Sequence, residues 1–167
     1  MKKNIQISII LLSCLLSVNL FGADVLTQKN IGLEAANDIA KLTIDACRKD
    51  GYNVSAVVVD KHGNIRSVMR DDLAAKFTID IAQRKANLVI MSGIASGAFR
   101  AARADIQQEM NNIDGIIMMQ GGLPIRAGGT LIGAVGVSGA PGSEKDEACA
   151  AAAIKAISER LEFASDN

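Results

Sequence analysis

The chain has 167 residues, with 18 basic and 18 acidic side chains and one His. This balance argues against a sequence-independent nucleic-acid binder, because such proteins usually carry a basic excess. Three Cys and one His cannot supply a four-cysteine or a two-cysteine, two-histidine zinc site within one chain. Only 3% of the residues are aromatic, so aliphatic side chains must build the core of what the length predicts to be one domain.

Residues 1–23 have the layout of a secretory signal peptide. Two lysines follow the first Met, an apolar run covers residues 7–18, and the small residues Gly22 and Ala23 come next. A membrane anchor is one alternative, but the run is shorter than the roughly 20 residues that span a bilayer. Lipid attachment at Cys14 is another. We expect residues 24–167 to be the mature protein, periplasmic or secreted and without membrane attachment.

The first half of the mature chain predicts helices around a hairpin. Apolar residues recur at helical spacing from Leu33 to Cys47, and Asp50 and Gly51 supply the stop. A β-branched run at 54–59, turn residues at 60–64 and an alternating run at 65–70 predict a β-hairpin. Two more helices are predicted over residues 78–91 and 96–111, the first of them ended by Gly93.

The second half predicts three strands and a last helix. The strands cover residues 115–119, 121–125 and 130–137, and glycine pairs separate them. The helix begins at Ser143, where Asp146 three residues later is typical of a capping box, and it continues to about residue 162. Because tight turns join antiparallel neighbours, we predict an α+β domain with a mostly antiparallel sheet of about five strands flanked by helices.

The remaining cysteines, Cys47 and Cys149, allow two interpretations. A disulfide can persist in an oxidising compartment. Both residues also lie in helical patterns, where a cysteine is often a small buried apolar residue. We expect the second arrangement, two unpaired thiols.

Few side chains have an obvious chemical role. His62 lies in the predicted hairpin turn, where it is either an exposed turn residue or a ligand of a metal or haem. Met118 is either a core residue or a thioether contact to haem. The basic residues Arg70, Arg84 and Lys85 are either solvated or paired with carboxylates of a bound organic molecule. The glycine pairs 121–122 and 128–129 precede strands, so they predict hairpin turns, or places where the backbone closely approaches a ligand or another subunit, rather than phosphate loops.

Five segments, in order, resemble the GlcG/HbpS family, which is often described as haem-binding or haem-degrading. They cover residues 53–64, 70–72, 78–86, 121–125 and 132–140. The resemblance spans the chain from about Leu33 to the last helix. It implies a profilin-like α+β domain that forms higher oligomers, and the exported HbpS-type proteins are the most similar branch.

The resemblance also implies a site. In the family, the segment before the second helix, often Gly-Pro-His-Thr, approaches the ligand at a subunit boundary. Here that segment is Ala75-Lys76-Phe77-Thr78, so Phe77 replaces the frequent His. Thr78 then supplies an oxygen ligand to iron and Phe77 stacks on the porphyrin, while a helix-capping role competes for the same Thr78 hydroxyl.

We therefore expect an exported, oligomeric haem-binding protein for sensing, sequestration or trafficking. Haem lies between subunits against Thr78 and Phe77, with Met118 as a further contact and its propionates near Arg70, Arg84 or Lys85. Because no strong base or nucleophile accompanies this site, binding is favoured over catalysis. The alternatives are an enzyme of haem breakdown or of small hydroxy acids, and a scaffold for ferric iron and a sensor-protein partner that uses His62.

Overall fold

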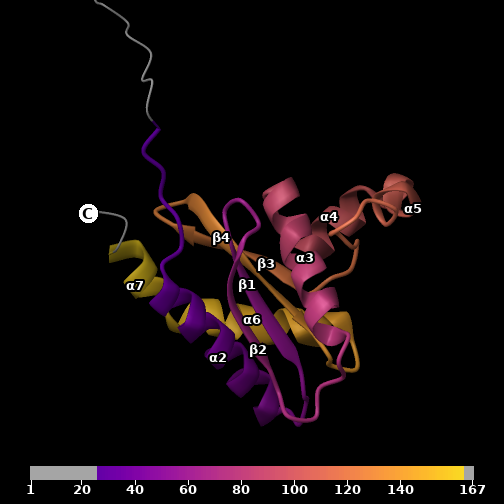
Figure 1. The fold of residues 1–167 in the computed structure, drawn as a ribbon, viewed down its shortest axis with the longest axis horizontal. Helices are drawn as coiled ribbons and strands as arrows, with labels where there is room; N and C mark the ends of the chain where they lie inside the picture. Colours follow the sequence, from indigo (N-terminus) through magenta and orange to yellow (C-terminus); the bar gives the residue numbers. More distant parts are fainter. Residues whose placement is uncertain (1–25, 164–167) are drawn as a thin grey trace, which may run out of the picture.

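The computed structural model describes residues 26–163 (Figure 1). The predicted signal peptide, residues 1–23 with Cys14, lies outside the described residues. No helix in the described part of the chain is both long and apolar enough to cross a membrane. Figure 1 shows α5 and α7 at opposite ends of the molecule, with the sheet between them.

The described chain alternates helical and strand segments. Its elements are α2 (Leu33–Lys49), β1 (Ser55–Asp60), β2 (Ile65–Arg70), α3 (Thr78–Ser92), α4 (Ser96–Ala102), the 3-10 turn η2 (Ala104–Ile106), α5 (Gln107–Met110), β3 (Gly122–Ala127), β4 (Thr130–Ser138), α6 (Ser143–Ala156) and α7 (Ser158–Phe163). The predicted hairpin is confirmed as β1 and β2. The predicted end of α3 is confirmed as well, because Gly93 adopts a positive φ of 75°.

The four strands form one sheet in the order β2-β1-β4-β3, and all neighbours are antiparallel. The α+β prediction is confirmed, but the predicted strand at 115–119 is wrong. That segment forms no strand. Its residues Ile116 and Met118 instead pack with Leu88 and Met110 in a small separate core. An apolar run indicates burial, and here the burial is under a loop rather than in the sheet.

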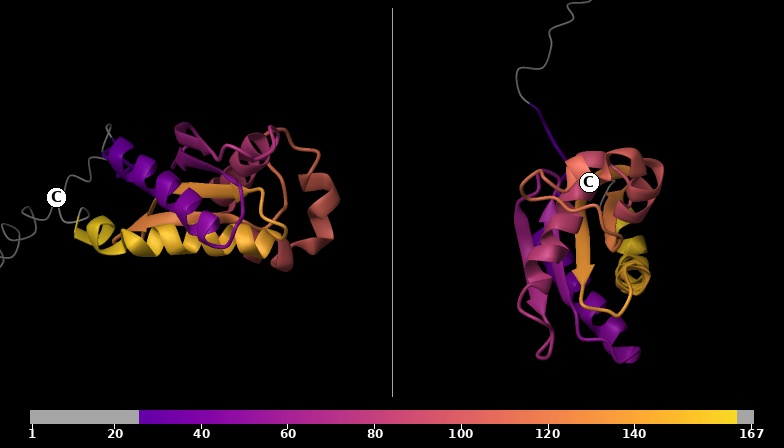
Figure 2. Two further views of the ribbon diagram at one scale, coloured as in Figure 1. Left: turned by 90° about the horizontal axis from the view of Figure 1, so that it is seen from below. Right: turned by 90° about the vertical axis from the view of Figure 1, so that its right-hand side faces the viewer.

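Helices cover both faces of the sheet. On one face, Ala56 and Val58 of β1 join the main core with α2 and α6, which lie side by side in the left view of Figure 2. On the other face, Val57 and Val59 pack against α3. Every residue of β1 is therefore buried, as its β-branched sequence favours.

Two paired glycines bring α3 against the sheet. Gly122 of β3 lies opposite Gly136 of β4. A Cβ atom on Gly136 would be 1.9 Å from the carbonyl oxygen of Ala82, and one on Gly122 would be 2.5 Å from that of Lys85. Gly122 therefore serves a close approach to the backbone of α3 in the same chain, rather than the predicted approach to a ligand or another subunit. The pair Gly128 and Gly129 forms the β3–β4 turn with positive φ at both residues.

Two predicted helices are interrupted. Arg103, with φ −129° and ψ 40°, separates α4 from the following turn, and Ile157 separates α6 from α7. The predicted capping box is wrong, because the N-cap of α6 is Gly142 and no side chain caps it. Asp146 makes other hydrogen bonds, described below.

Cys47 of α2 and Cys149 of α6 form a disulfide. The expectation of two unpaired thiols is wrong. Because α2 and α6 pack on the same face of the sheet, they bring the two Cα atoms to 5.4 Å, within the range that a disulfide spans. The helical patterns predicted burial correctly but could not show that the two helices are neighbours.

Candidate ligand-binding groove around Thr78

A groove of about 390 Å³ opens at the end of the sheet where β1 begins and β4 ends. Three loops form it: the link from α2 to β1, the link from β2 to α3 and the link from β4 to α6. Antiparallel pairing brings them together, because Ser55 lies between Arg70 and Ser138 in the register. The lining residues are Gly51, Tyr52, Asn53, Leu73, Ala75, Thr78, Gly139 and Pro141.

Thr78 is the buried polar residue of this groove. Its hydroxyl donates to the carbonyl of Ala75 at 2.6 Å and lies 2.8 Å from Oγ of Ser55. A hydroxyl has one hydrogen and two lone pairs, so Ser55 is the donor in the second bond. Thr78 is not the N-cap of α3. Phe77 holds that position, and no side chain caps the helix. One lone pair of Thr78 Oγ1 remains.

Apolar side chains stand uncovered beside Thr78. Leu73 is 82% exposed and Phe77 is 72% exposed. The Lys76 ammonium lies 5.7 Å from the centre of the Phe77 ring, close enough for a cation–π contact. Large apolar side chains that gather at a groove mark a binding surface.

The loop that carries these side chains is fixed at both ends. Arg48 of α2 donates from Nε and Nη2 to the two carboxylate oxygens of Asp71, at 2.7 and 2.9 Å. This hydrogen bonding lowers the pKa of Asp71 and raises that of Arg48. The backbone N–H of Asp71 also donates to Val54 at 2.9 Å. Arg70 donates from Nη1 to the carbonyl of Ala74 in the same loop.

The other predicted basic residues lie elsewhere on α3. Arg84 forms an exposed ion pair with Asp80, with Nε and Oδ2 2.9 Å apart. Lys85 is buried and pairs with Asp146, so it presents no charge to the groove. Of the predicted haem contacts, only Thr78 lines the groove; Phe77 precedes it in the chain, and Arg70 bonds to Ala74 of the same loop. Met118 is fully buried in the small core under α4 and α5.

His62 lies at the opposite end of β1 from Thr78. It is exposed in the β1–β2 turn and lines a separate hollow of about 240 Å³ with Asn87 and Met91. The neighbouring carboxylate of Asp60 accepts hydrogen bonds from the backbone N–H of His62 and of Asn64, at 2.8 and 3.0 Å. Within residues 26–163, no three His, Cys, Asp or Glu side chains gather as a metal site.

Sequence reasoning missed most of the groove lining. Tyr52 and Asn53 precede β1, while Gly139 and Pro141 follow β4. The sequence did predict the strands that these residues flank. Only the pairing of β1 with β4 shows that the flanking loops meet. Lys145 was missed as well: its Nζ lies 5.2 Å from the centre of the Tyr52 ring.

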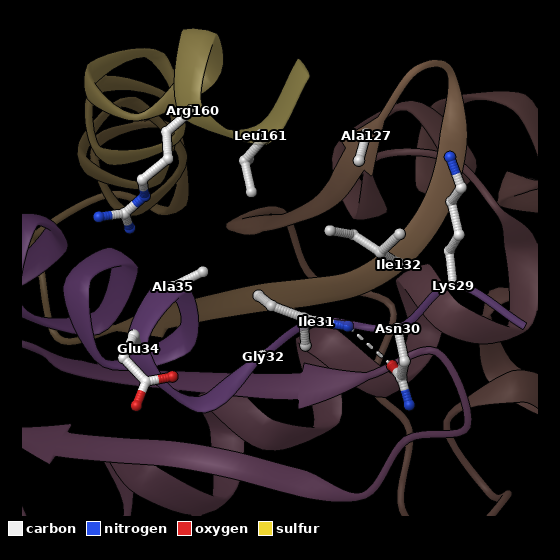
Figure 3. Close-up of a pocket in the computed structure, with 10 residues that line it drawn as sticks. All are labelled: Lys29, Asn30, Ile31, Gly32, Glu34, Ala35, Ala127, Ile132, Arg160 and Leu161. Atoms are coloured by element: carbon white, nitrogen blue, oxygen red, sulfur yellow. Dashed lines mark hydrogen bonds between the residues drawn. The ribbon is translucent and has the colours of Figure 1, made fainter. Parts of the chain in front are cut away.

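A second groove, of about 410 Å³, lies at the other end of the sheet (Figure 3). Its floor is apolar, with Ile31, Ile132 and Leu161 turned toward the hollow. Arg160 at its rim is paired with Asp38 at 2.7 Å. None of the predicted site residues lies here.

The chain is similar to known proteins in sequence and in fold. Residues 31–155 match the family described as haem degrading protein HbpS-like. A double mutant of Streptomyces reticuli HbpS is 32% identical, with a TM-score of 0.74, covering 81% of this chain and 92% of that one. Klebsiella pneumoniae ORFY is 29% identical, with a TM-score of 0.73 and coverage of 81% and 95%.

A third structure shares the fold at lower identity. It is a PduOC complex with haem, 21% identical, with a TM-score of 0.70 and coverage of 77% of this chain and 95% of that one. Comparison with curated protein sequences gave no match.

Proposed function

The chain belongs to the HbpS-like family, and we propose that it binds haem in the groove around Thr78. The observation that carries the proposal is the position of Thr78, buried at the groove beside the exposed side chains of Phe77 and Leu73. The family description refers to haem, and a PduOC protein of the same fold is known in complex with haem.

The groove residues fit the chemistry of haem. Haem is a flat apolar ring with two propionates, and Leu73 and Phe77 offer apolar surface to such a ring. The volume of about 390 Å³ is near the lower end of the roughly 300–1,000 Å³ typical of ligand pockets. One chain therefore supports part of the ligand, and the exposed side of Phe77 is left for a second subunit of a homo-oligomer to cover.

The chain's own residues divide the work of binding. Phe77 and Leu73 hold the ring, and Arg70, which bonds to Ala74 in the same loop, pairs with a propionate. Thr78 offers its remaining lone pair as a neutral oxygen ligand, weaker than the imidazole that the family often has. Arg84 lies further along α3 than Thr78. It can be a second propionate partner only if its ion pair with Asp80 opens. When bound, haem supplies an iron centre that can take small ligands or electrons.

We propose binding, for sensing, sequestration or trafficking of haem, rather than turnover. Among the described residues that line the groove there is no His, Cys, Asp or Glu to move a proton near neutral pH. The disulfide supports a location in the periplasm or outside the cell, where such bonds persist. The family description favours haem breakdown as the second candidate; product analysis with reductant and oxygen distinguishes it from binding.

The test is an absorbance titration of the purified protein with ferric haem. We expect a saturable, shifted Soret band that weakens in Thr78→Ala and in Phe77→Ala. Thr130→Ala and Phe163→Ala are matched controls, because they remove the same side chains at exposed positions outside the groove. Equal titrations for all four variants would overturn the proposed site, and a featureless wild-type titration would overturn haem binding.

A further inference from the structure

A buried ion pair connects α3 to the first turn of α6. Nζ of Lys85 lies 2.8 Å from Oδ2 of Asp146, with side chains only 1% and 4% exposed. The same ammonium donates to the carbonyl of Val137 at 2.8 Å. Burial lowers the pKa of Lys85 and raises that of Asp146. The pair is thus removed from solvent, and the proposed function does not use it.

The second carboxylate oxygen of Asp146 reaches the groove wall. Oδ1 accepts a hydrogen bond from the backbone N–H of Ala140 at 3.0 Å. Ala140 stands between Gly139 and Pro141, which both line the groove. One carboxylate therefore bridges the ammonium on α3 and the loop that forms one side of the ligand groove.

The loop fits closely against the opposite wall. A Cβ atom on Gly139 would lie 2.5 Å from the carbonyl oxygen of Asn53, which is also a lining residue. Gly139 has a positive φ of 133°, a conformation that glycine adopts most readily. The position of Ala140 thus decides how the loop meets Asn53, and so the width of the groove.

A buried ion pair is a poor source of stability. Removing two charges from water costs about as much as their attraction returns, and well-packed apolar replacements are often neutral or stabilising. The hydrogen bond to Ala140 is different, because an unpaired backbone N–H at a partly buried site must find another acceptor or water. The loop has to move to provide either.

We propose that Asp146, oriented by Lys85, is a positioning residue that sets the loop 139–141 and thereby the shape of the ligand groove. The inference rests on the proposed function for its ligand. Its geometric part, the placement of the loop by one carboxylate oxygen, stands on the described contacts alone. Neither residue touches the ligand in this account.

The test compares two double variants that differ at position 146, one with and one without an acceptor for Ala140. Lys85→Met with Asp146→Asn removes both charges but keeps a carbonyl oxygen for the Ala140 N–H. Lys85→Met with Asp146→Leu removes both charges and the acceptor. The carbonyl of Val137 loses its Lys85 donor in both variants. Comparing the two variants therefore isolates the hydrogen bond to the loop.

With ferric haem as the probe, we expect the Leu variant to bind about tenfold more weakly than the Asn variant, the scale of one lost hydrogen bond. Unfolding midpoints serve as the control for a merely structural effect. Equal haem affinities in the two variants would overturn the proposal. So would an affinity loss that simply follows the loss of stability.

Amide hydrogen exchange without haem separates this proposal from haem binding itself. We expect the amides of Gly139, Ala140 and Gly142 to exchange faster in the Leu variant than in the Asn variant. If wild type binds no haem, the proposed function fails while this readout still tests the loop; equal exchange would then overturn the positioning role. If a double variant does not fold, the single variant Asp146→Asn replaces it: the retained Lys85 ammonium takes the one amide oxygen of Asn, Ala140 loses its acceptor, and its amide should exchange faster than in wild type.

Discussion

Ser55 of β1 donates its hydroxyl hydrogen to Oγ1 of Thr78, 2.8 Å away, and Thr78 donates its own to the carbonyl of Ala75 at 2.6 Å. This chain of two hydrogen bonds fixes the direction of the only buried hydroxyl in the described lining of the groove. It leaves Thr78 one lone pair for a ligand. The same bonds tie the start of α3 to the start of β1.

The Ser55–Thr78 contact makes a prediction for stability. Thr78→Val keeps the shape of the side chain but leaves the buried Ser55 hydroxyl without its partner, which costs about 1–3 kcal/mol. Adding Ser55→Ala should recover part of that loss. Urea unfolding of the two single variants and the double variant measures the coupling. Strictly additive changes would show that the two hydroxyls do not interact.

The disulfide makes a second prediction. Cys47 and Cys149 are 102 residues apart in sequence, and closing a loop of that length stabilises the folded state by about 4–5 kcal/mol in the chain-entropy view. The double variant Cys47→Ala with Cys149→Ala should therefore unfold at lower urea concentration than wild type. Reductant should lower the wild-type midpoint and leave that of the double variant unchanged. A wild-type midpoint equal to that of the double variant would contradict the bond.

The Arg48–Asp71 pair predicts a pH dependence. The pKa of Asp71 is lowered in the folded state, first by its hydrogen bond with Arg48, so the unfolded chain binds the proton more readily. The stabilisation from this ion pair is therefore fully present above the unfolded Asp pKa of about 3.9. It is lost as the pH falls through the lower pKa of Asp71 in the folded state. Unfolding midpoints of wild type should fall more steeply below about pH 4 than those of Asp71→Asn. Parallel curves would contradict this role.

The close approach of α3 to β4 predicts a large effect of a single methyl group. Gly136→Ala would place a Cβ atom 1.9 Å from the carbonyl oxygen of Ala82, so the helix must shift. We expect the free energy of unfolding to fall by about 3 kcal/mol or more. Gly32→Ala is the control, because no atom lies within 4 Å of its added Cβ. Similar thermal unfolding of the two variants would contradict the close packing.

The sequence predicted the helices and strands better than it predicted which of them pack against each other. The β-branched residues of β1 and the stop at Gly93 follow from local chemistry, and both predictions are confirmed. The pairing of Cys47 with Cys149 depends on which helices are neighbours, and periodicity does not contain that information. Met118 shows the same limit, because burial could be predicted for it but the separate core that buries it could not.

The site was predictable in part. The family resemblance pointed to Thr78 and Phe77; Thr78 lines the groove, and Phe77 precedes it as an exposed side chain. Lys85 was predicted to be solvated or paired with a carboxylate of a bound molecule, and it is instead buried in an internal ion pair. Its carboxylate partner Asp146 lies 61 residues later, in the first turn of α6, and only the tertiary fold brings the two side chains together.

Whether haem occupies the groove around Thr78 can be seen in a two-dimensional amide NMR spectrum of the protein with and without ferric haem. Paramagnetic iron broadens nearby signals. We expect broadening that begins at Asn53, Thr78 and Gly139 and spares Ile31 and Ile132 in the second groove. Broadening centred on Ile31 and Ile132 or on His62, or no broadening at saturating haem, would contradict haem binding in the groove around Thr78.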